Sequence, residues 1–224
     1  MNNFYFIIGP IAAGKSTFME YRLYNSMEAT VNFFDHDKEK LMMQLYAPGE
    51  KKNMAKALKN AIDDCYNNKK DFMMQAHFTN EQLPEINKYF HSYGNKFNIL
   101  AHFISVSDSG ILKIRSERRD RLGGHHSELK SIDKTYEQSY RNFITYLPKF
   151  VKATIWDNSK EYGIDTMEHQ FVYERGMLSF QNSSITDFAK KLLAEAQLSV
   201  TAALQLQRGK QERLGNNYDK GMSM

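Results

Sequence analysis

The segment from Gly9 to Ser16 has the residue types and spacing that bind a polyphosphate. It fits G-x-x-x-x-G-K-[ST], the P-loop, in which glycines let several backbone N–H groups point at one phosphate. A helix that follows adds the positive end of its dipole. In this pattern the Lys15 ammonium group bridges the β- and γ-phosphates of ATP, and the Ser16 hydroxyl binds Mg²⁺. The predicted nucleotide-binding residues are Gly9, Pro10, Ile11, Ala12, Ala13, Gly14, Lys15, Ser16 and Thr17.

Two carboxylates, Asp35 and Asp37, follow an apolar segment from Ala29 to Phe34 that favours a β-strand. Ligands of an open α/β sheet bind beyond the carboxyl ends of its strands. A carboxylate there can accept the proton of an attacking hydroxyl or help to hold Mg²⁺. The alternative is that one of the two caps the next helix, and for Asp35 both interpretations stay open.

Four arginines, Arg115, Arg118, Arg119 and Arg121, precede the turn Gly123-Gly124-His125. On a helix, positions 115 and 119 share a face, and so do positions 118 and 121. Guanidinium groups match phosphate oxygens and neutralise the charge that develops during phosphoryl transfer. The alternative is a solvated basic face, but beside a P-loop the cluster favours contact between at least one arginine and a phosphate.

Short apolar segments alternate with amphipathic ones, which predicts an α/β fold with an open, mostly parallel sheet and helices on both faces. The predicted strands are Phe4 to Ile8, Ala29 to Phe34, Phe72 to Met74, Phe97 to Val106 and Ala153 to Asp157. The predicted helices are about Lys15 to Ser26, Glu50 to Asn67, Pro84 to Tyr93, Gly110 to Leu122, Ile132 to Leu147 and Ser184 to Arg208. We expect a P-loop kinase-like domain over 1–183, with an arginine-bearing lid over about 110–135. A C-terminal helix over 184–208 should pack on it, followed by a flexible tail over 209–224.

These motifs, in this order, resemble the zeta-toxin family of P-loop kinases over about Phe4 to Ser159. Members carry a comparable acid-bearing segment, and often F-x-x-E-T-T-x-S where this chain has Phe72 to Thr79. Arg115 and Arg119 stand before the Gly-Gly-His turn as in the family pattern R-V-x-x-R-V-x-x-G-G-H. The remaining matches are Tyr136, Ser139 and Asn142 at the family spacing, and Asp157-Asn158-Ser159 at a late D-N-S.

The resemblance implies phosphoryl transfer from ATP with Mg²⁺, and in characterised relatives the acceptor is the 3′-hydroxyl of a UDP-N-acetyl amino sugar. It also implies an antitoxin-like protein partner. By matching position, Asp37 is the general base, and Arg115 with Arg119 or Arg121 clamps the transferring phosphate. The substrate contacts that it implies are Asp35, Gln75, His77, Thr79 and His125.

The chain departs from the family at four of these positions. Gln75 replaces a glutamate, Ala76 and His77 replace two threonines, and Thr135 replaces an arginine. Glutamine keeps the reach of glutamate but loses its charge and its ability to accept a proton. The sequence therefore leaves two outcomes open: a different acceptor, or nucleotide binding without efficient transfer.

The overall composition is that of a globular protein of one domain, with 42% hydrophobic and 25% charged residues. Cys65 is the only cysteine, and the longest apolar runs fall short of the roughly 20 residues of a membrane span, so we expect a cytoplasmic protein. The net charge of +4 permits an anionic small substrate without requiring nucleic acid. We predict an ATP-dependent kinase acting on a small-molecule hydroxyl; the alternatives are a nucleotide-binding regulatory module and a polynucleotide or RNA kinase.

Overall fold

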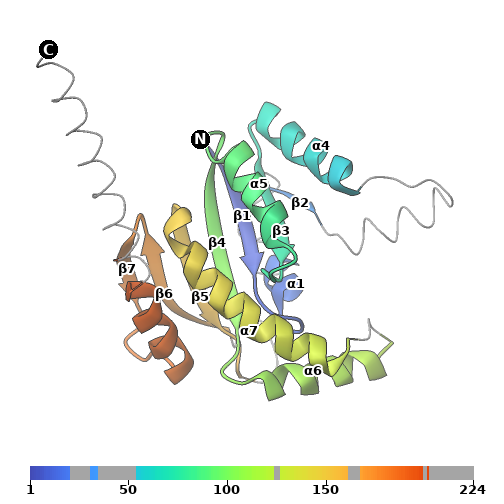
Figure 1. The fold of residues 1–224 in the computed structure, drawn as a ribbon, viewed down its shortest axis with the longest axis vertical. Coiled ribbons are helices and arrows are strands. Elements are labelled where there is room, and N and C mark those ends of the chain that lie inside the picture. Colours follow the sequence, from blue (N-terminus) through green and yellow to red (C-terminus); the bar gives the residue numbers. More distant parts are fainter. Residues whose placement is uncertain (21–30, 35–53, 124–126, 161–166, 199–200, 202–224) are drawn as a thin grey trace, which may run out of the picture.

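The computed structural model describes residues 1–20, 31–34, 54–123, 127–160, 167–198 and 201 (Figure 1). Three of the predicted site residues, Asp35, Asp37 and His125, lie outside these ranges. So do the predicted tail over 209–224 and the last part of the predicted C-terminal helix.

The described strands form one seven-stranded sheet with the order β2-β3-β1-β4-β5-β6-β7. Strands β2, β3, β1, β4 and β5 pair in parallel, whereas β6 and β7 extend the sheet in antiparallel fashion. Their bounds are β1 Asn2–Ile8, β2 Val31–Phe34, β3 Asp71–Ala76, β4 Phe97–Ser105, β5 Lys152–Asp157, β6 Glu168–Glu174 and β7 Met177–Gln181. The predicted fold class, an open and mostly parallel α/β sheet, is confirmed.

Strand β1 lies inside the sheet and is covered on both faces from Phe4 to Ile8, as this apolar run predicts. Phe4 and Phe6 point into one core cluster, while Tyr5 and Ile7 point into the other, because successive side chains of a strand alternate. Helices α4 Met54–Asn67, α5 Leu83–Tyr93 and α7 Leu129–Tyr146 contribute to the first cluster, together with a helix over 187–198. The second cluster takes residues from α1 Lys15–Phe18, from α6 Ser109–Arg121 and from the start of α7. The helices therefore cover both faces of the sheet (Figure 1).

The hairpin of β6 and β7 was not predicted. Glu174 pairs with Met177, so the turn has two residues, Arg175 and Gly176, and both have positive φ angles of 51° and 79°. Such turns match the right-handed twist of the two strands they join. The Arg-Gly pair after a segment that contains Phe171, Val172 and Tyr173 was the signal in the sequence.

The helix boundaries follow local chemistry. The Asp108 side chain accepts a hydrogen bond from the Gly110 N–H and so caps α6. Helix α5 ends at Tyr93, as predicted, and Gly94 follows it. None of the helices in the described ranges has both the length and the apolar composition that crossing a membrane requires.

Candidate active site

The glycine-rich loop lies between β1 and α1, at the carboxyl edge of the parallel strands (Figure 1). Since β1 is flanked by β3 and β4, residues that follow these two strands border the loop. Gly14 adopts a φ of 95°, a left-handed conformation that glycine reaches without strain. The second glycine of the P-loop pattern therefore occupies a position whose backbone conformation favours glycine.

The Lys15 ammonium group is buried inside this loop, with the residue only 6% exposed. Its Nζ donates hydrogen bonds to the Gly9 carbonyl at 2.9 Å and to the Pro10 carbonyl at 2.7 Å. It lies 3.0 Å from the Nδ1 atom of His77, just beyond β3. An ammonium group has three protons and accepts none, so these three contacts match its full donor capacity.

His77 is therefore a partner of Lys15. Its Nδ1 must be the acceptor, because an ammonium group only donates. The Lys15 charge, together with burial, lowers the pKa of the His77 imidazole from 6.5 to about 3. Sequence analysis placed His77 among the substrate contacts; the structure places it first against the P-loop lysine.

Gln75 lies on β3 and contacts the other chemically important residue of the loop. The Ser16 hydroxyl donates to Gln75 Oε1 at 3.2 Å. Gln75 is in register with Ile7 of β1, so its side chain lies on the face of the sheet that carries α1. A residue predicted to contact the substrate thus also positions the hydroxyl that the P-loop pattern assigns to Mg²⁺.

A cavity of about 440 Å³ opens in front of the loop and brings most predicted site residues together. Arg115 and Arg119 of α6 line it opposite Gln75 and His77. Its full lining is Ile11, Ala12, Gly14, Lys15, Ser16, Thr17, Gln75, His77, Arg115, Arg119 and Ser127. Because the loop amides, one lysine and two arginines converge here, a polyanion is the ligand that this cavity fits. We call it the phosphate cavity.

Two predicted site residues lie elsewhere. Arg121 is not among the lining residues: its side chain is 81% exposed, and its Nη2 lies 3.8 Å from Glu117 on the same helix. Thr79 is buried, and its carbonyl accepts hydrogen bonds from Gln82 and Leu83 at the start of α5. Of the predicted arginine clamp, the structure brings only Arg115 and Arg119 to the cavity.

Arg115 also stabilises the loop indirectly. Its Nη2 donates to the backbone carbonyls of Asn158 and Lys160, at 2.7 and 2.9 Å. Asn158 in turn donates from Nδ2 to the Ala13 carbonyl at 2.8 Å. The predicted D-N-S segment therefore connects α6 to the P-loop.

A column of buried polar residues on α7 fixes the same loop and the end of β3. Thr135 Oγ1 accepts from the Ile11 N–H at 3.2 Å and donates to the Ile132 carbonyl at 3.0 Å. Ser139 donates to the His77 carbonyl, and Asn142 donates to the Phe78 carbonyl at 2.8 Å. The i, i+4, i+7 spacing of these polar residues was the signal in the sequence, because it places them on one helix face.

Replacing Thr135 with valine is expected to destabilise the protein by about 1–3 kcal/mol, because the Ile11 N–H loses its acceptor. Binding of Mg·ADP should weaken by about tenfold, since one loop amide is no longer held. Urea denaturation and calorimetric titration measure the two effects. Thr145→Val is the matched control, because Thr145 is exposed on the same helix and donates only to the Arg141 carbonyl in the described structure. Equal effects of the two variants would contradict the assigned role of Thr135.

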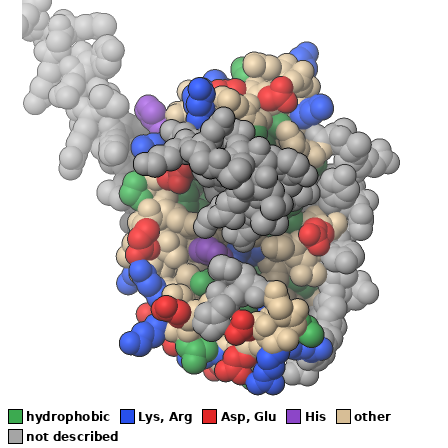
Figure 2. Space-filling model, turned by 90° about the vertical axis from the view of Figure 1, so that its right-hand side faces the viewer, with side chains coloured by type: hydrophobic (Ala, Val, Ile, Leu, Met, Phe, Trp, Pro, Cys, Tyr) green, Lys and Arg blue, Asp and Glu red, His purple; other side chains and the backbone are tan. Residues whose placement is uncertain are grey.

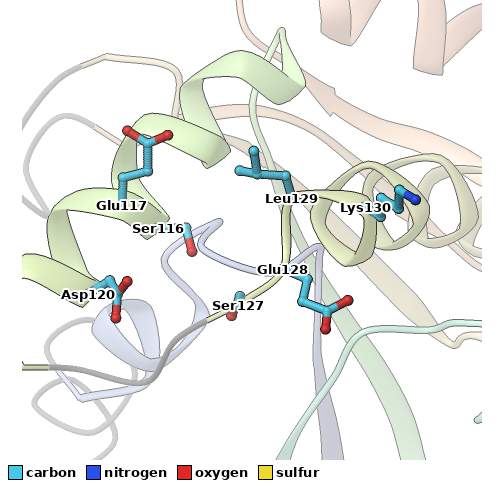
Figure 3. Close-up of a pocket in the computed structure, with 7 residues that line it drawn as sticks. All are labelled: Ser116, Glu117, Asp120, Ser127, Glu128, Leu129 and Lys130. Carbon is cyan, nitrogen blue, oxygen red and sulfur yellow. The ribbon is translucent and has the colours of Figure 1, made fainter.

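Two further cavities adjoin the phosphate cavity. The one in Figure 3, about 550 Å³, lies between α6 and α7 and is lined by Ser116, Glu117, Asp120, Ser127, Glu128, Leu129 and Lys130. Its three carboxylates repel phosphate, so it suits a polyanion less well than the phosphate cavity does. The other, about 240 Å³, shares Lys15, Gln75 and His77 with the phosphate cavity and reaches α5. We call it the α5 cavity; it also contains Met74, Ala76, Gln82, Glu85, Ile86 and Tyr89.

The residues that α5 and the turn before it contribute to the α5 cavity, Gln82, Glu85, Ile86 and Tyr89, were missed by sequence analysis. The Gln82 side chain accepts from the His77 and Phe78 N–H groups, at 3.0 and 2.8 Å, and so fixes the backbone beyond β3. Tyr89 donates to the Glu85 carboxylate at 2.5 Å. Burial and this carboxylate raise the pKa of the Tyr89 phenol. Gln82, Glu85 and Tyr89 match no sequence motif, so nothing in the sequence pointed to them.

No protein-family model and no curated protein matches the sequence. Solved structures match the fold. A structure of the PezAT chromosomal toxin-antitoxin system of Streptococcus pneumoniae is 10% identical, with a TM-score of 0.53, over 90% of this chain and 87% of that one. The AvrRxo1-ORF1:ORF2 complex with ATP is 9% identical, with a TM-score of 0.50, over 90% of this chain and 76% of that one.

The Pnkp1/Rnl/Hen1 RNA repair complex is also similar, at 19% identity and a TM-score of 0.52, over 63% of this chain. The match spans 45% of the length of the chain in that complex. At these identities the likeness shows the fold alone. The sheet order and the glycine-rich loop after β1 define that fold as the P-loop kinase type, as predicted.

Proposed function

We propose that this protein is an ATP-dependent phosphotransferase that phosphorylates a hydroxyl group of a small molecule. The observation that carries the proposal is the phosphate cavity, in which the P-loop faces two arginines of α6. Phosphoryl transfer depends mainly on positioning and on stabilising the charge of the transferring group. Backbone amides, Lys15 and Arg119 are the groups that supply that stabilisation.

The residues present fit a magnesium ion bound together with ATP. Mg²⁺ prefers hard oxygen ligands and keeps part of its water shell, and Ser16 presents an exposed hydroxyl at the cavity. Ser16 would hold the ion, which supplies charge neutralisation at the phosphate oxygens. Asp37 remains our proposed general base, by resemblance and by its place after β2; it lies outside the described residues.

The α5 cavity supports the choice of a small acceptor. It meets the phosphate cavity at Lys15 and His77, so a hydroxyl group held there lies beside the transferring phosphate. A volume of about 240 Å³ suits a sugar or nucleoside ring, and Glu85 can accept hydrogen bonds from its hydroxyls. A UDP-N-acetyl amino sugar is the first acceptor to test, since Gln75 keeps the hydrogen-bonding reach of the family's glutamate.

The proposal is tested by release of ADP from Mg·ATP in the presence of nucleotide sugars, nucleosides and other small hydroxyl compounds. We expect one class of acceptor to stimulate release in the wild type. ATP binding without stimulation by any acceptor would favour a nucleotide-binding regulatory module instead.

Replacing Arg119 with alanine is expected to slow acceptor-stimulated transfer by about 100-fold, because the cavity loses a guanidinium group that faces the phosphate. Arg121→Ala is the matched control two positions along α6 and should change the rate less than about twofold, since its side chain is exposed and faces Glu117. The rate of ADP release measures both. An equal loss in the two variants would contradict the assignment of Arg119.

A polynucleotide acceptor is the second candidate, because the fold is shared with part of an RNA repair complex. Figure 2 shows basic and acidic side chains interspersed over the coloured part of one face, rather than a basic stripe. Salt-dependent binding of an oligonucleotide, with phosphorylation of its end, would favour this candidate over a small molecule.

A protein partner is a further element of the proposal. Two of the structures with this fold are complexes or systems of two components, PezAT and AvrRxo1-ORF1:ORF2. Co-purification of a second protein encoded beside this one, followed by loss of ADP release in the complex, is the corresponding test.

A further inference from the structure

His77 makes two contacts that suit two different protonation states. Its Nδ1 lies 3.0 Å from the Lys15 ammonium group and 3.2 Å from the Gly9 carbonyl oxygen. A neutral imidazole can accept from Lys15 through Nδ1 but cannot at the same time donate to Gly9 from that atom. An Nδ1 that carries a proton, in the imidazolium or in the neutral Nδ1–H tautomer, can donate to Gly9 but cannot accept from Lys15. The same geometry therefore provides a partner for each state.

Lys15 is already saturated before any ligand binds. Two loop carbonyls and His77 lie within hydrogen-bonding distance of its Nζ atom, one for each proton of the ammonium group. To donate to a phosphate oxygen, Lys15 must give up one of these acceptors. The carbonyls of Gly9 and Pro10 belong to the backbone of the loop, whereas His77 is a side chain from the neighbouring strand, and it is the acceptor most readily exchanged.

We propose that His77 is a positioning residue whose protonation is linked to occupancy of the P-loop by phosphate. In the empty loop it is neutral and accepts a hydrogen bond from Lys15. When a phosphate group takes that hydrogen bond, the freed Nδ1 lone pair binds a proton from solvent, and the new N–H donates to the Gly9 carbonyl. The imidazolium then adds one positive charge beside the bound phosphate. This inference rests on the proposed nucleotide binding.

The electrostatics of the site favour this linkage. The charge of Lys15 is the largest cause of the lowered His77 pKa, and burial is the second. The contact with the Gly9 carbonyl opposes them, and the charge of Arg119 lowers the pKa by a smaller amount. A polyphosphate carries several negative charges, so its arrival offsets both cations and moves the pKa upward. The charged groups that face His77 across the two cavities are Lys15 on α1, Arg115 and Arg119 on α6 and Glu85 on α5.

The sign of the pH dependence follows. Because binding raises the pKa of His77, binding takes up protons and becomes tighter as the pH falls. If the pKa in the complex reaches its ordinary value near 6.5, about three quarters of a proton is taken up near pH 6, and almost none near pH 8. Affinity then rises about tenfold between pH 7.5 and 5.5.

The test is calorimetric titration with Mg·ADP, which does not react, in buffers of different ionisation enthalpy near pH 6 and pH 8. His77→Asn is the informative variant, since its Oδ1 can accept from Lys15 near the position of Nδ1 but takes up no proton. His91→Gln is the matched control, because His91 is exposed on α5. Protonation of ADP itself contributes equally to all three proteins, so differences in proton uptake belong to His77.

We expect wild type and His91→Gln to take up about three quarters of a proton more than His77→Asn near pH 6, and all three to agree near pH 8. The NMR signal of the His77 ring should titrate in this range only in the ADP complex. Equal proton uptake by wild type and His77→Asn, with ADP bound by both, would overturn the role of His77 alone. Absence of ADP binding in the wild type would overturn the proposed function and this inference with it.

Discussion

Replacing Lys15 with alanine is expected to reduce phosphoryl transfer by about 10³-fold while the protein stays folded. The ammonium group is the cation buried within the P-loop, and its hydrogen bonds to Gly9 and Pro10 fix it beside the site of the transferring phosphate. Alanine removes the charge and the contacts with Gly9, Pro10 and His77.

The measurement is the rate of acceptor-stimulated ADP release, with circular dichroism to establish folding. Lys190→Ala is the control, because the Lys190 side chain is 61% exposed and pairs only with Asp187 in the described structure. Retention of more than about a tenth of the wild-type rate by Lys15→Ala would place the chemistry outside the P-loop.

Replacing Gly9 with alanine is expected to destabilise the fold by more than about 3 kcal/mol. A Cβ atom at this position would lie 2.1 Å from the Ile104 carbonyl oxygen, a backbone atom of the adjacent strand β4. Gly9 cannot shift away, because its N–H donates to the Ala76 carbonyl of β3 on the other side, at 3.2 Å. Relieving the clash requires separating β1 from one of its two neighbours.

Urea denaturation of Gly9→Ala measures this effect, and Gly123→Ala separates it from backbone strain. Gly123 has a φ of 79°, but an added Cβ would meet nothing within 4 Å among the described residues. Its replacement should cost only about 1–2 kcal/mol, the strain of a left-handed alanine. A cost for Gly9→Ala no larger than for Gly123→Ala would mean that β1 and β4 can separate locally without loss of packing.

The parts of the fold that depend on local sequence were predictable. The apolar run before Gly9 and the P-loop each act within a few residues, and the strand and the loop lie where the sequence predicted them. The hairpin of β6 and β7 was missed because its two-residue Arg-Gly turn is a weaker signal than Asn-Gly or Asp-Gly.

The site was predictable as a set of residues but not as a set of contacts. The P-loop, Arg115 and Arg119 come together as the motifs suggested. Gln75 and His77 were assigned to the substrate by resemblance, whereas the strand order places them against Ser16 and Lys15. That order, with β3 beside β1, comes from long-range pairing that no spacing along the chain reveals.

The departure at Thr135 has a physical meaning that the sequence alone concealed. Its hydroxyl accepts a hydrogen bond from the Ile11 N–H. A position that usually carries arginine in the zeta-toxin family therefore holds the P-loop in this chain. Arg121 was assigned to the phosphate clamp by resemblance, but it does not reach the cavity. It lies two positions from Arg119 on α6, so its side chain points to a different side of the helix. Spacing on α6 restricted the arginines that could act together, and the path of the helix past the loop decided which of them reach the cavity.

The most direct test of the central claim is transfer of label from γ-phosphate-labelled ATP, with Mg²⁺, to the small molecules of a cell extract. We predict a labelled compound that forms with the wild type but not with Lys15→Ala, and that loses its label to a phosphomonoesterase. Label that stays in ATP, or appears only as inorganic phosphate while ATP is bound, would contradict the assignment of this protein as a phosphotransferase to a hydroxyl group.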